Sequence, residues 1–306
     1  MTGIQNLLSK LKKQKVLMLM LIPFLAHLLL FKYYPMYGNL IAFKDYSFSK
    51  GIIGSPWAGF KWFEYFFNSS DFWIVMRNTV VISVLSLIFT TAASIVFAIL
   101  VCELRNLYMK KFVQTVSYLP HFISWVVVAG MAFTLFSIDG GSINKFLVDI
   151  HVIDKPVNFL GDEQLYWPVI TFLNVWKSAG YNSILYIAAI TAIDRQMYES
   201  AIIDGANKWK QIIYITLPCI KPTIVILLVL SLGYVLNAGL DQQFFMGNPL
   251  NMEHSQVLDT YIVRYGLQQL EYSYGTAVGL FRSIISLVLV VIANMISRRL
   301  FKMGVF

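Results

Sequence analysis

The sequence predicts an all-α protein that crosses a membrane six times, and three observations support this fold class. Hydrophobic residues make up 58% of the chain and charged residues only 13%, whereas soluble domains carry about a quarter charged residues. The mean hydropathy is +0.65. Apolar runs near or above the roughly 20 residues that cross a bilayer recur along the chain, and Lys and Arg concentrate in alternate connections between them. The predicted spans are residues 16–34, 74–101, 112–136, 165–193, 223–240 and 272–297.

The first apolar run follows basic residues, as a signal peptide would. No small-residue cleavage site follows it, because residues 31–35 are Phe, Lys, Tyr, Tyr and Pro. We therefore predict a retained helix. The chain then divides into an N-terminal tail at 1–15, one membrane domain at 16–297 and a C-terminal tail at 298–306.

The distribution of charge predicts the orientation of these spans, because Lys and Arg in short connections stay in the cytoplasm. One set of segments holds 14 basic and 4 acidic residues: 1–15, 102–111, 194–222 and 298–306. The opposite set holds 7 basic and 12 acidic residues: 35–73 with Lys32, 137–164 and 241–271. Both tails are therefore expected in the cytoplasm. The net charge of +8 reflects topology, and no nucleic-acid partner is expected.

The connection at 194–222 is the longest on the predicted cytoplasmic side, and such length usually has a function. Its apolar residues recur at helical spacing, which predicts two short amphipathic helices under the membrane. Gly205 lies between them and permits a turn. The pair Leu217 and Pro218 is expected to end the second helix before the next span begins at Lys221.

This connection resembles the EAA loop of permease subunits of binding-protein-dependent ATP-binding-cassette importers. Glu199, Ser200 and Ala201 precede Gly205 at the spacing of that motif, and Ile215, Leu217 and Pro218 follow it. Ser200 replaces the usual alanine with another small residue. The resemblance implies the type I importer permease fold, with coupling helices that dock on a cytoplasmic ATPase. The implied docking residues are Glu199, Ser200, Ala201, Asp204, Gly205, Ala206, Trp209, Ile215, Leu217 and Pro218.

Further strings narrow the resemblance to LplB-type oligosaccharide permeases of the maltose-permease class. They include Tyr118-Leu119-Pro120-His121-Phe122-Ile123-Ser124-Trp125 and Ala42-Phe43-Lys44-Asp45-Tyr46. The resemblance implies half of a heterodimeric pore in a bacterial cell membrane. The implied partners are a second permease, two ATPase subunits, an extracellular solute-binding lipoprotein and an oligosaccharide. No P-loop occurs, so the chain is expected to bind no cofactor, and ATP and Mg²⁺ are expected on the ATPase subunits.

Polar residues inside predicted spans indicate a route for the substrate, because such residues face a bundle interior or a wet cavity. Asn174, Lys177, Ser178 and Tyr181 share one face of the fourth span, with Trp176 beside it. Ser231, Tyr234 and Asn237 form a second set in the fifth span. These residue types suit a sugar, and the resemblance points to the same two helices. They are expected either to bind the sugar or only to line its route.

Lys177 has two readings. Its charge could pair with an acidic sugar, or with a carboxylate of the partner permease.

Rival functions lack their expected signals. An ion-coupled transporter would show acids within its spans or an inverted repeat, and an intramembrane enzyme would need a catalytic pair. The predicted spans contain no Asp or Glu, and no metal-ligand spacing occurs. An importer permease for another small solute remains an alternative. Arg77 and Arg282 near span ends are expected to extend toward the interface.

Overall fold

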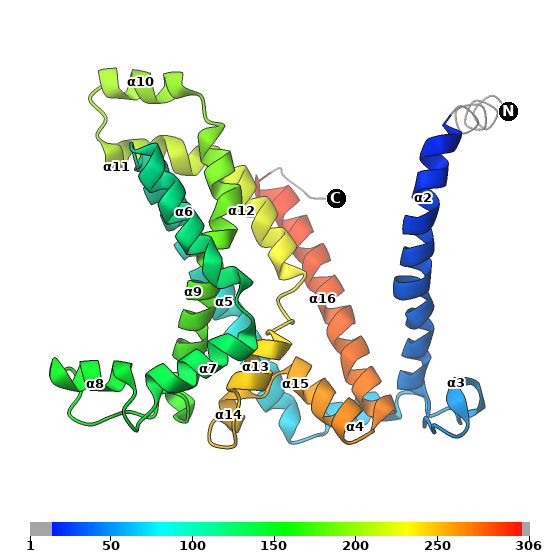
Figure 1. Ribbon diagram of the computed structural model, residues 1–306. Helices are drawn as coiled ribbons and strands as arrows, with labels where there is room; N and C mark the ends of the chain where they lie inside the picture. Colours follow the sequence, from blue (N-terminus) through cyan, green and yellow to red (C-terminus); the bar gives the residue numbers. More distant parts are fainter. Residues whose placement is uncertain (1–13, 302–306) are drawn as a thin grey trace.

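The computed structural model describes residues 14–301, and these residues form helices without a strand. The regular pairing in the described chain is one isolated bridge between Lys44 and Trp57. The long helices lean together as a bundle, and short helices gather at one of its ends (Figure 1). The all-α membrane fold predicted from the sequence is confirmed.

The first helix is longer than the predicted span 16–34. α2 (Lys15–Leu28), a π-helical turn (Leu29–Tyr33) and a 3₁₀ segment (Tyr34–Phe43) form one continuous helix of 29 residues. No side chain of α2 is buried, and α2 stands apart from the bundle in Figure 1. The 3₁₀ segment joins it to the rest of the chain by packing against the last helix.

α5 (Asp71–Glu103) and α9 (Glu163–Thr191) pack along each other and form the centre of the bundle. Two short helices precede α5, namely α3 (Gly51–Gly54) and α4 (Lys61–Phe67). A core of buried apolar side chains, including Ile82 and Ile170, joins α5 and α9 to the elements around them. Between helices in a bilayer, such contacts stabilise the bundle through close van der Waals packing.

The predicted span 112–136 is not one straight helix. α6 (Leu107–Phe122) and α7 (Trp125–Phe136) meet at an angle of 99°, with a break at residues 123–124. The Ser124 side chain accepts a hydrogen bond from the Val127 backbone N–H and so caps α7. α7 then leads to the short α8 (Ser142–Asp149) at the edge of the molecule (Figure 1).

α6 crosses α9 in very close contact. A Cβ atom added to Gly180 of α9 would lie 2.1 Å from the carbonyl oxygen of Ser117 in α6. Only glycine permits this approach, and it brings the bend between α6 and α7 next to the middle of α9.

After α9, the chain forms α10 (Arg195–Ile203), α11 (Lys208–Gln211), a π-helical segment (Ile212–Thr216) and α12 (Leu217–Leu232). The expectation that Leu217 and Pro218 end the second short helix is wrong, because residues 208–232 form one helix. Pro218 lies in the first turn of α12, directly after the π-helical segment. A proline is tolerated there because the shifted hydrogen-bond register needs no donor from it.

The predicted span 223–240 also differs from the structure, since α12 ends at Leu232 and a turn precedes α13 (Leu240–Met246). Next come α14 (Met252–Ser255), α15 (Leu258–Ile262) and a π-helical segment, η4 (Val263–Gln268). The last helix is α16 (Tyr272–Phe301). Buried aromatic side chains, including Phe66, Tyr261 and Tyr274, hold α4, α15 and α16 together.

Four described helices are long and apolar enough to cross a membrane, and the bent pair α6–α7 makes a fifth candidate. α9 has 29 residues, enough to cross, but its polar residues lower its hydropathy below that of the others. Six spans are therefore not established by composition and length alone. The described chain begins and ends at the end of the bundle that carries α10 and α11 (Figure 1).

Candidate functional site

A cavity of about 350 Å³ lies among α5, α9 and the turn after α12. Its lining contains no charged side chain, and amides and hydroxyls alternate with apolar groups. The polar lining residues are Ser83, Ser86, Thr90, Thr91, Asn174, Ser178, Asn182, Ser231, Tyr234, Asn237 and Gln242, and Trp125 adds an indole ring. Such a lining offers hydrogen bonds and flat apolar surface without a fixed charge.

The structure divides the polar face predicted on α9. Asn174 and Ser178 line the cavity, and their side chains make a hydrogen bond of 3.4 Å. Asn182, one further helical turn along, also lines it. Lys177 and Tyr181 instead face the bend between α6 and α7. The sequence reasoning missed Asn182, although it continues the spacing of four residues from Asn174.

α5 supplies a row of hydroxyl groups that the sequence reasoning also missed. Ser83, Ser86 and Thr90 follow the helical spacing i, i+3 and i+7, which was the available signal. Each has a buried side-chain oxygen without a hydrogen-bond partner among the described residues. Buried polar groups are nearly always paired. These three residues line the cavity, and their buried hydroxyls have hydrogen-bonding capacity that the described residues leave unused.

Neither reading of Lys177 from the sequence matches its surroundings. Its ammonium group donates hydrogen bonds to three backbone carbonyl oxygens, at 3.3 Å for Pro120, 2.7 Å for His121 and 2.5 Å for Ile123. These carbonyls lie at the C-terminal end of α6 and in the bend after it, where helical hydrogen bonding ends. The Pro120 carbonyl also accepts from the Ile123 N–H at 3.2 Å. A positive charge there also complements the negative end of the helix dipole. Lys177 is 8% exposed and does not line the cavity.

The same bend holds two aromatic contacts. The Tyr181 ring stacks on the His121 ring with centroids 3.8 Å apart, so Tyr181 packs against α6. The Lys177 ammonium lies 5.8 Å from the centroid of the Trp125 ring, which lines the cavity. Trp176 is partly exposed and lies outside the cavity lining. The motif from Tyr118 to Trp125 thus forms the bend and one cavity wall.

The second predicted set lies at the end of α12 and not along a helical face. Ser231 is in the last turn of α12, while Tyr234 and Asn237 are in the turn that follows. All three line the cavity. Tyr234 is 72% exposed, and the Ser231 hydroxyl donates to the Leu227 carbonyl at 2.8 Å. Gly239, with φ of +83°, redirects the chain into α13.

The loop of α10 and α11 has the glycine turn that the sequence predicts. Gly205 has φ of +77°. Its N–H donates to the Ile202 carbonyl at 3.0 Å, and the Ala206 N–H donates to the Ala201 carbonyl at 2.8 Å. This is a Schellman cap, which satisfies the last carbonyls of α10. The Asn207 side chain then accepts from the Lys210 N–H and caps α11.

One side of this loop is tied to the bundle. Lys208 forms an ion pair with Glu103 of α5, with Nζ and Oε2 2.8 Å apart. The Tyr198 hydroxyl makes a hydrogen bond of 2.9 Å with the Thr216 hydroxyl. These contacts connect α10 and α11 to α5 and to the start of α12.

The other side of the loop is open. Trp209 is 73% exposed, and Ile202 and Ile203 are exposed beside it. Of the predicted docking residues, the exposed ones are Glu199, Ser200, Asp204, Gly205, Trp209 and Pro218; Ala201, Ala206, Ile215 and Leu217 are half-buried. An exposed surface of large apolar side chains is typical of a protein contact.

Arg77 and Arg282 do not extend freely to the interface as expected. Arg282 forms an ion pair with Asp259 of α15. Arg77 donates to the Glu253 carbonyl at 3.0 Å and lies over the Trp167 ring. Both therefore join long helices to the short helices at the end of the bundle opposite α10. Within the described residues, no group of His, Cys, Asp or Glu is arranged to hold a metal ion.

A known protein family matches residues 92–302, and it is described as the binding-protein-dependent transport system inner membrane component. The chain belongs to this family. Protein LplB of Bacillus subtilis is 41% identical to the permease over 299 residues, which cover 98% of this chain and 93% of LplB. The polygalacturonan/rhamnogalacturonan transport system permease protein YteP of the same organism is 41% identical over 302 residues, which cover 99% and 94%.

A solved structure supports the same assignment. The permease matches a chain of a bacterial ABC transporter involved in the import of the acidic polysaccharide alginate, with a TM-score of 0.88 and 40% identity. The match covers 96% of this chain and 99% of the other. The resemblance to importer permeases of the LplB type is therefore confirmed, and with it the all-α permease fold.

Proposed function

We propose that the permease forms half of a heterodimeric pore that imports an oligosaccharide, driven by ATPase subunits on the cytoplasmic side. The uncharged cavity among α5, α9 and α12 is the observation that carries this proposal. Hydroxyl-bearing residues of α5 and amides of α9 line it together, and both residue types suit the hydroxyl groups of a sugar. Relatives named for sugar polymers support the substrate class.

In this proposal, Asn174 and Ser178 on α9, with Ser231, Tyr234 and Asn237 after α12, lie along the substrate route. Trp125 offers its ring as a flat apolar surface for a sugar. Lys177 and Tyr181 act as positioning residues, since they fix the bend that carries Trp125. Trp176 takes no part in the cavity wall. The second permease would complete the cavity.

The loop of α10 and α11 is the proposed contact with an ATPase subunit. Its exposed Trp209, Ile202 and Ile203 supply the apolar surface, and Glu199 and Asp204 supply charge at its edge. Its ties to α5 and α12 would pass a movement of the loop to the helices that line the cavity. ATP and Mg²⁺ would bind to the ATPase subunits, and this chain would catalyse no reaction.

The opposite end of the bundle is the proposed outer side, where a solute-binding protein would deliver the sugar. Both tails would then lie in the cytoplasm, as the positive charges predict. A solved transporter of this kind, similar to this chain, is described in complex with an alginate pentasaccharide-bound periplasmic protein.

The cavity is tested by removing hydroxyls that make no bond within the chain. In the assembled transporter, Ser86→Ala with Thr90→Val should lower oligosaccharide uptake about fivefold or more, because each lost hydrogen bond to substrate is worth about 1 kcal/mol. Stability should be unchanged. Thr171→Val is the matched control, since Thr171 also has a buried unpaired hydroxyl but does not line the cavity. Full uptake in the double variant would contradict the proposed route.

A further inference from the structure

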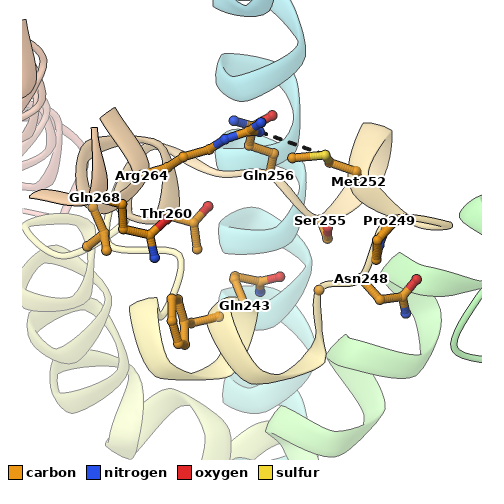
Figure 2. A pocket seen from close by; sticks show the side chains of 12 residues that line it. Gln243, Asn248, Pro249, Met252, Ser255, Gln256, Thr260, Arg264 and Gln268 are labelled. Carbon is orange, nitrogen blue, oxygen red and sulfur yellow. Dashed lines mark hydrogen bonds between the residues drawn. The ribbon is translucent and has the colours of Figure 1, made fainter. Parts of the chain in front are cut away.

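A second pocket, of about 260 Å³, lies between α13 and η4 at the end of the bundle opposite α10 (Figures 1 and 2). We call it the α13–η4 pocket. Figure 2 shows Arg264 beside Met252 at one rim, with Gln268 and Thr260 of the same wall facing Gln243 of α13. Its lining contains one charged residue, Arg264, and no acid.

Arg264 differs from the other two arginines of this region because its guanidinium group has no oxygen acceptor among the described residues. Arg282 is paired with Asp259, and Arg77 donates to the Glu253 carbonyl. Arg264 makes only a contact of 3.8 Å from Nη1 to the Met252 sulfur and lies over the Tyr265 ring. A guanidinium group presents parallel donors that match a carboxylate. The parallel N–H donors of Arg264, which would make its strongest hydrogen bonds, therefore have no carboxylate to bind within the described chain.

The pocket holds a second unused donor. The Nε2 atom of Gln256 is buried and has no hydrogen-bond acceptor within the described chain. Gln268 adds an exposed amide, and Phe244 and Pro249 add apolar surface. A guanidinium group, amides and an apolar wall are together the groups that would bind a sugar with a carboxylate.

The walls of this pocket are held in place by the bundle. The Asn78 amide of α5 donates to the carbonyls of Glu253 at 2.8 Å and Gln256 at 3.0 Å. On the other wall, the Tyr265 hydroxyl donates to the Asp71 carboxylate at 3.2 Å. Burial raises the pKa of Tyr265 to about 12, so this hydroxyl keeps its proton at neutral pH. Because the walls of the pocket are held in position before a ligand binds, binding costs less conformational entropy.

The residues of this chain that line the membrane cavity cannot supply a charged partner for a sugar carboxylate. No charged side chain lines it, and the three donors of Lys177 are occupied by backbone carbonyls. Among the described residues, a charged partner for an acidic sugar must therefore lie outside this cavity.

We propose that the α13–η4 pocket is an outer subsite for one uronic-acid unit of the transported oligosaccharide, with Arg264 binding the sugar carboxylate. This inference rests on the proposed import of an oligosaccharide and names its class as acidic. The amides of Gln256 and Gln268 bind hydroxyls of the same unit, and Phe244 covers one face of its ring.

The test measures binding of trigalacturonate and of its methyl ester to the purified transporter in nanodiscs, without the binding protein. The ester has the same sugar units but no charge, and it carries a methyl group on each carboxyl. The wild type should bind the acid about tenfold more tightly than the ester, as expected for a hydrogen bond to a charged group. Arg264→Gln should remove this difference. Gln268→Glu, at an exposed position, should weaken binding of the acid alone. Lys50→Gln removes an exposed charge elsewhere on the same end and should change neither.

Equal affinity of the wild type for both probes would overturn the proposal, as would a preference that survives both Arg264→Gln and Gln268→Glu. Weaker capture of the binding protein by Arg264→Gln, with sugar binding unchanged, would assign the pocket to a protein contact and also overturn it. Failure of the proposed import would appear differently, as absent ATP-driven uptake by the intact transporter.

Discussion

At the scale of single residues, Lys177 is the side chain whose surroundings differ most from expectation. A lysine in an apolar helix suggests a partner of opposite charge, and the structure gives it the end of a neighbouring helix. The bend between α6 and α7 interrupts the helical hydrogen bonds, and one ammonium group donates to three carbonyls there. In this structure the charge of Lys177 is therefore engaged in holding the bend between α6 and α7.

Lys177→Met should lower the stability of the assembled permease by about 2 kcal/mol or more, because three carbonyls at the end of α6 lose a charged donor. The melting temperature should fall, whereas any preference between acidic and neutral sugars should persist. Lys145→Met is the control, since Lys145 is exposed on α8. A stable Lys177→Met variant that loses only its preference for acidic sugars would support the substrate reading instead.

Residue spacing predicted much of the membrane cavity. Asn174 and Ser178, four residues apart, line it, as do Ser231 in the last turn of α12 and Tyr234 and Asn237 in the turn that follows. Lys177 and Tyr181 were wrongly placed on that face because spacing alone cannot tell which neighbour a broad polar face meets. That α9 turns part of this face toward α6 depends on the close approach at Gly180. This is a packing contact between helices distant in sequence.

At the scale of elements, the loop of α10 and α11 has the turn that its glycine predicts. The backbone at Gly205 has φ of +77°, which a residue with a Cβ atom adopts only with strain. Open space surrounds that position, so the restriction comes from the backbone alone. The shape of the loop can therefore be altered without disturbing the core.

Gly205→Asp should abolish ATP-driven uptake, because it strains the turn that orients α10 toward the proposed ATPase contact. Glu199→Lys should lower uptake strongly by reversing an exposed charge on the same surface. Asp149→Lys makes the same change of charge on α8, at the opposite end of the molecule, and should be tolerated. ATPase activity and uptake are measured together in membrane vesicles. Full assembly and full uptake in both loop variants would exclude the coupling role.

Two elements were predicted incorrectly from the sequence. They are the bend at residues 123–124 and the continuous helix at residues 208–232. Apolar residues continue through the bend, so hydropathy indicates a single span, and only the Ser124 cap marks the break. Conversely, Pro218 and Pro222 suggest that a helix ends. The π-helical segment at Ile212–Thr216 shifts the hydrogen-bond register, and the helix continues. The intrinsic helix propensities of single residues are therefore outweighed by the cap at Ser124 and by the π-helical segment before Pro218.

At the scale of the whole molecule, the helices place α10 and both ends of the described chain together, and the α13–η4 pocket at the other end. The charge distribution independently predicts that the end with α10 faces the cytoplasm. The proposed ATPase contact on α10 and α11 and the α13–η4 pocket would thus bind different partners on opposite sides of the membrane.

Cysteine labelling of intact cells checks this orientation. In a variant without Cys102 and Cys219, Ser49→Cys should react with a membrane-impermeant maleimide, whereas Ser200→Cys should react only after the cells are opened. Both positions are exposed in the structure. Labelling of Ser200→Cys in intact cells would reverse the topology and remove the proposed ATPase contact.

The isolation of α2 affects how freely its sequence can change. Because none of its side chains is buried within this chain, exchanging one apolar residue for a smaller one there opens no internal void. The same exchange at Ile82, which is fully packed, would cost about 1 kcal/mol. Within this chain, α2 is constrained by the thickness and polarity of the bilayer, so its sequence can drift among apolar residues while α5 and α9 must conserve volume.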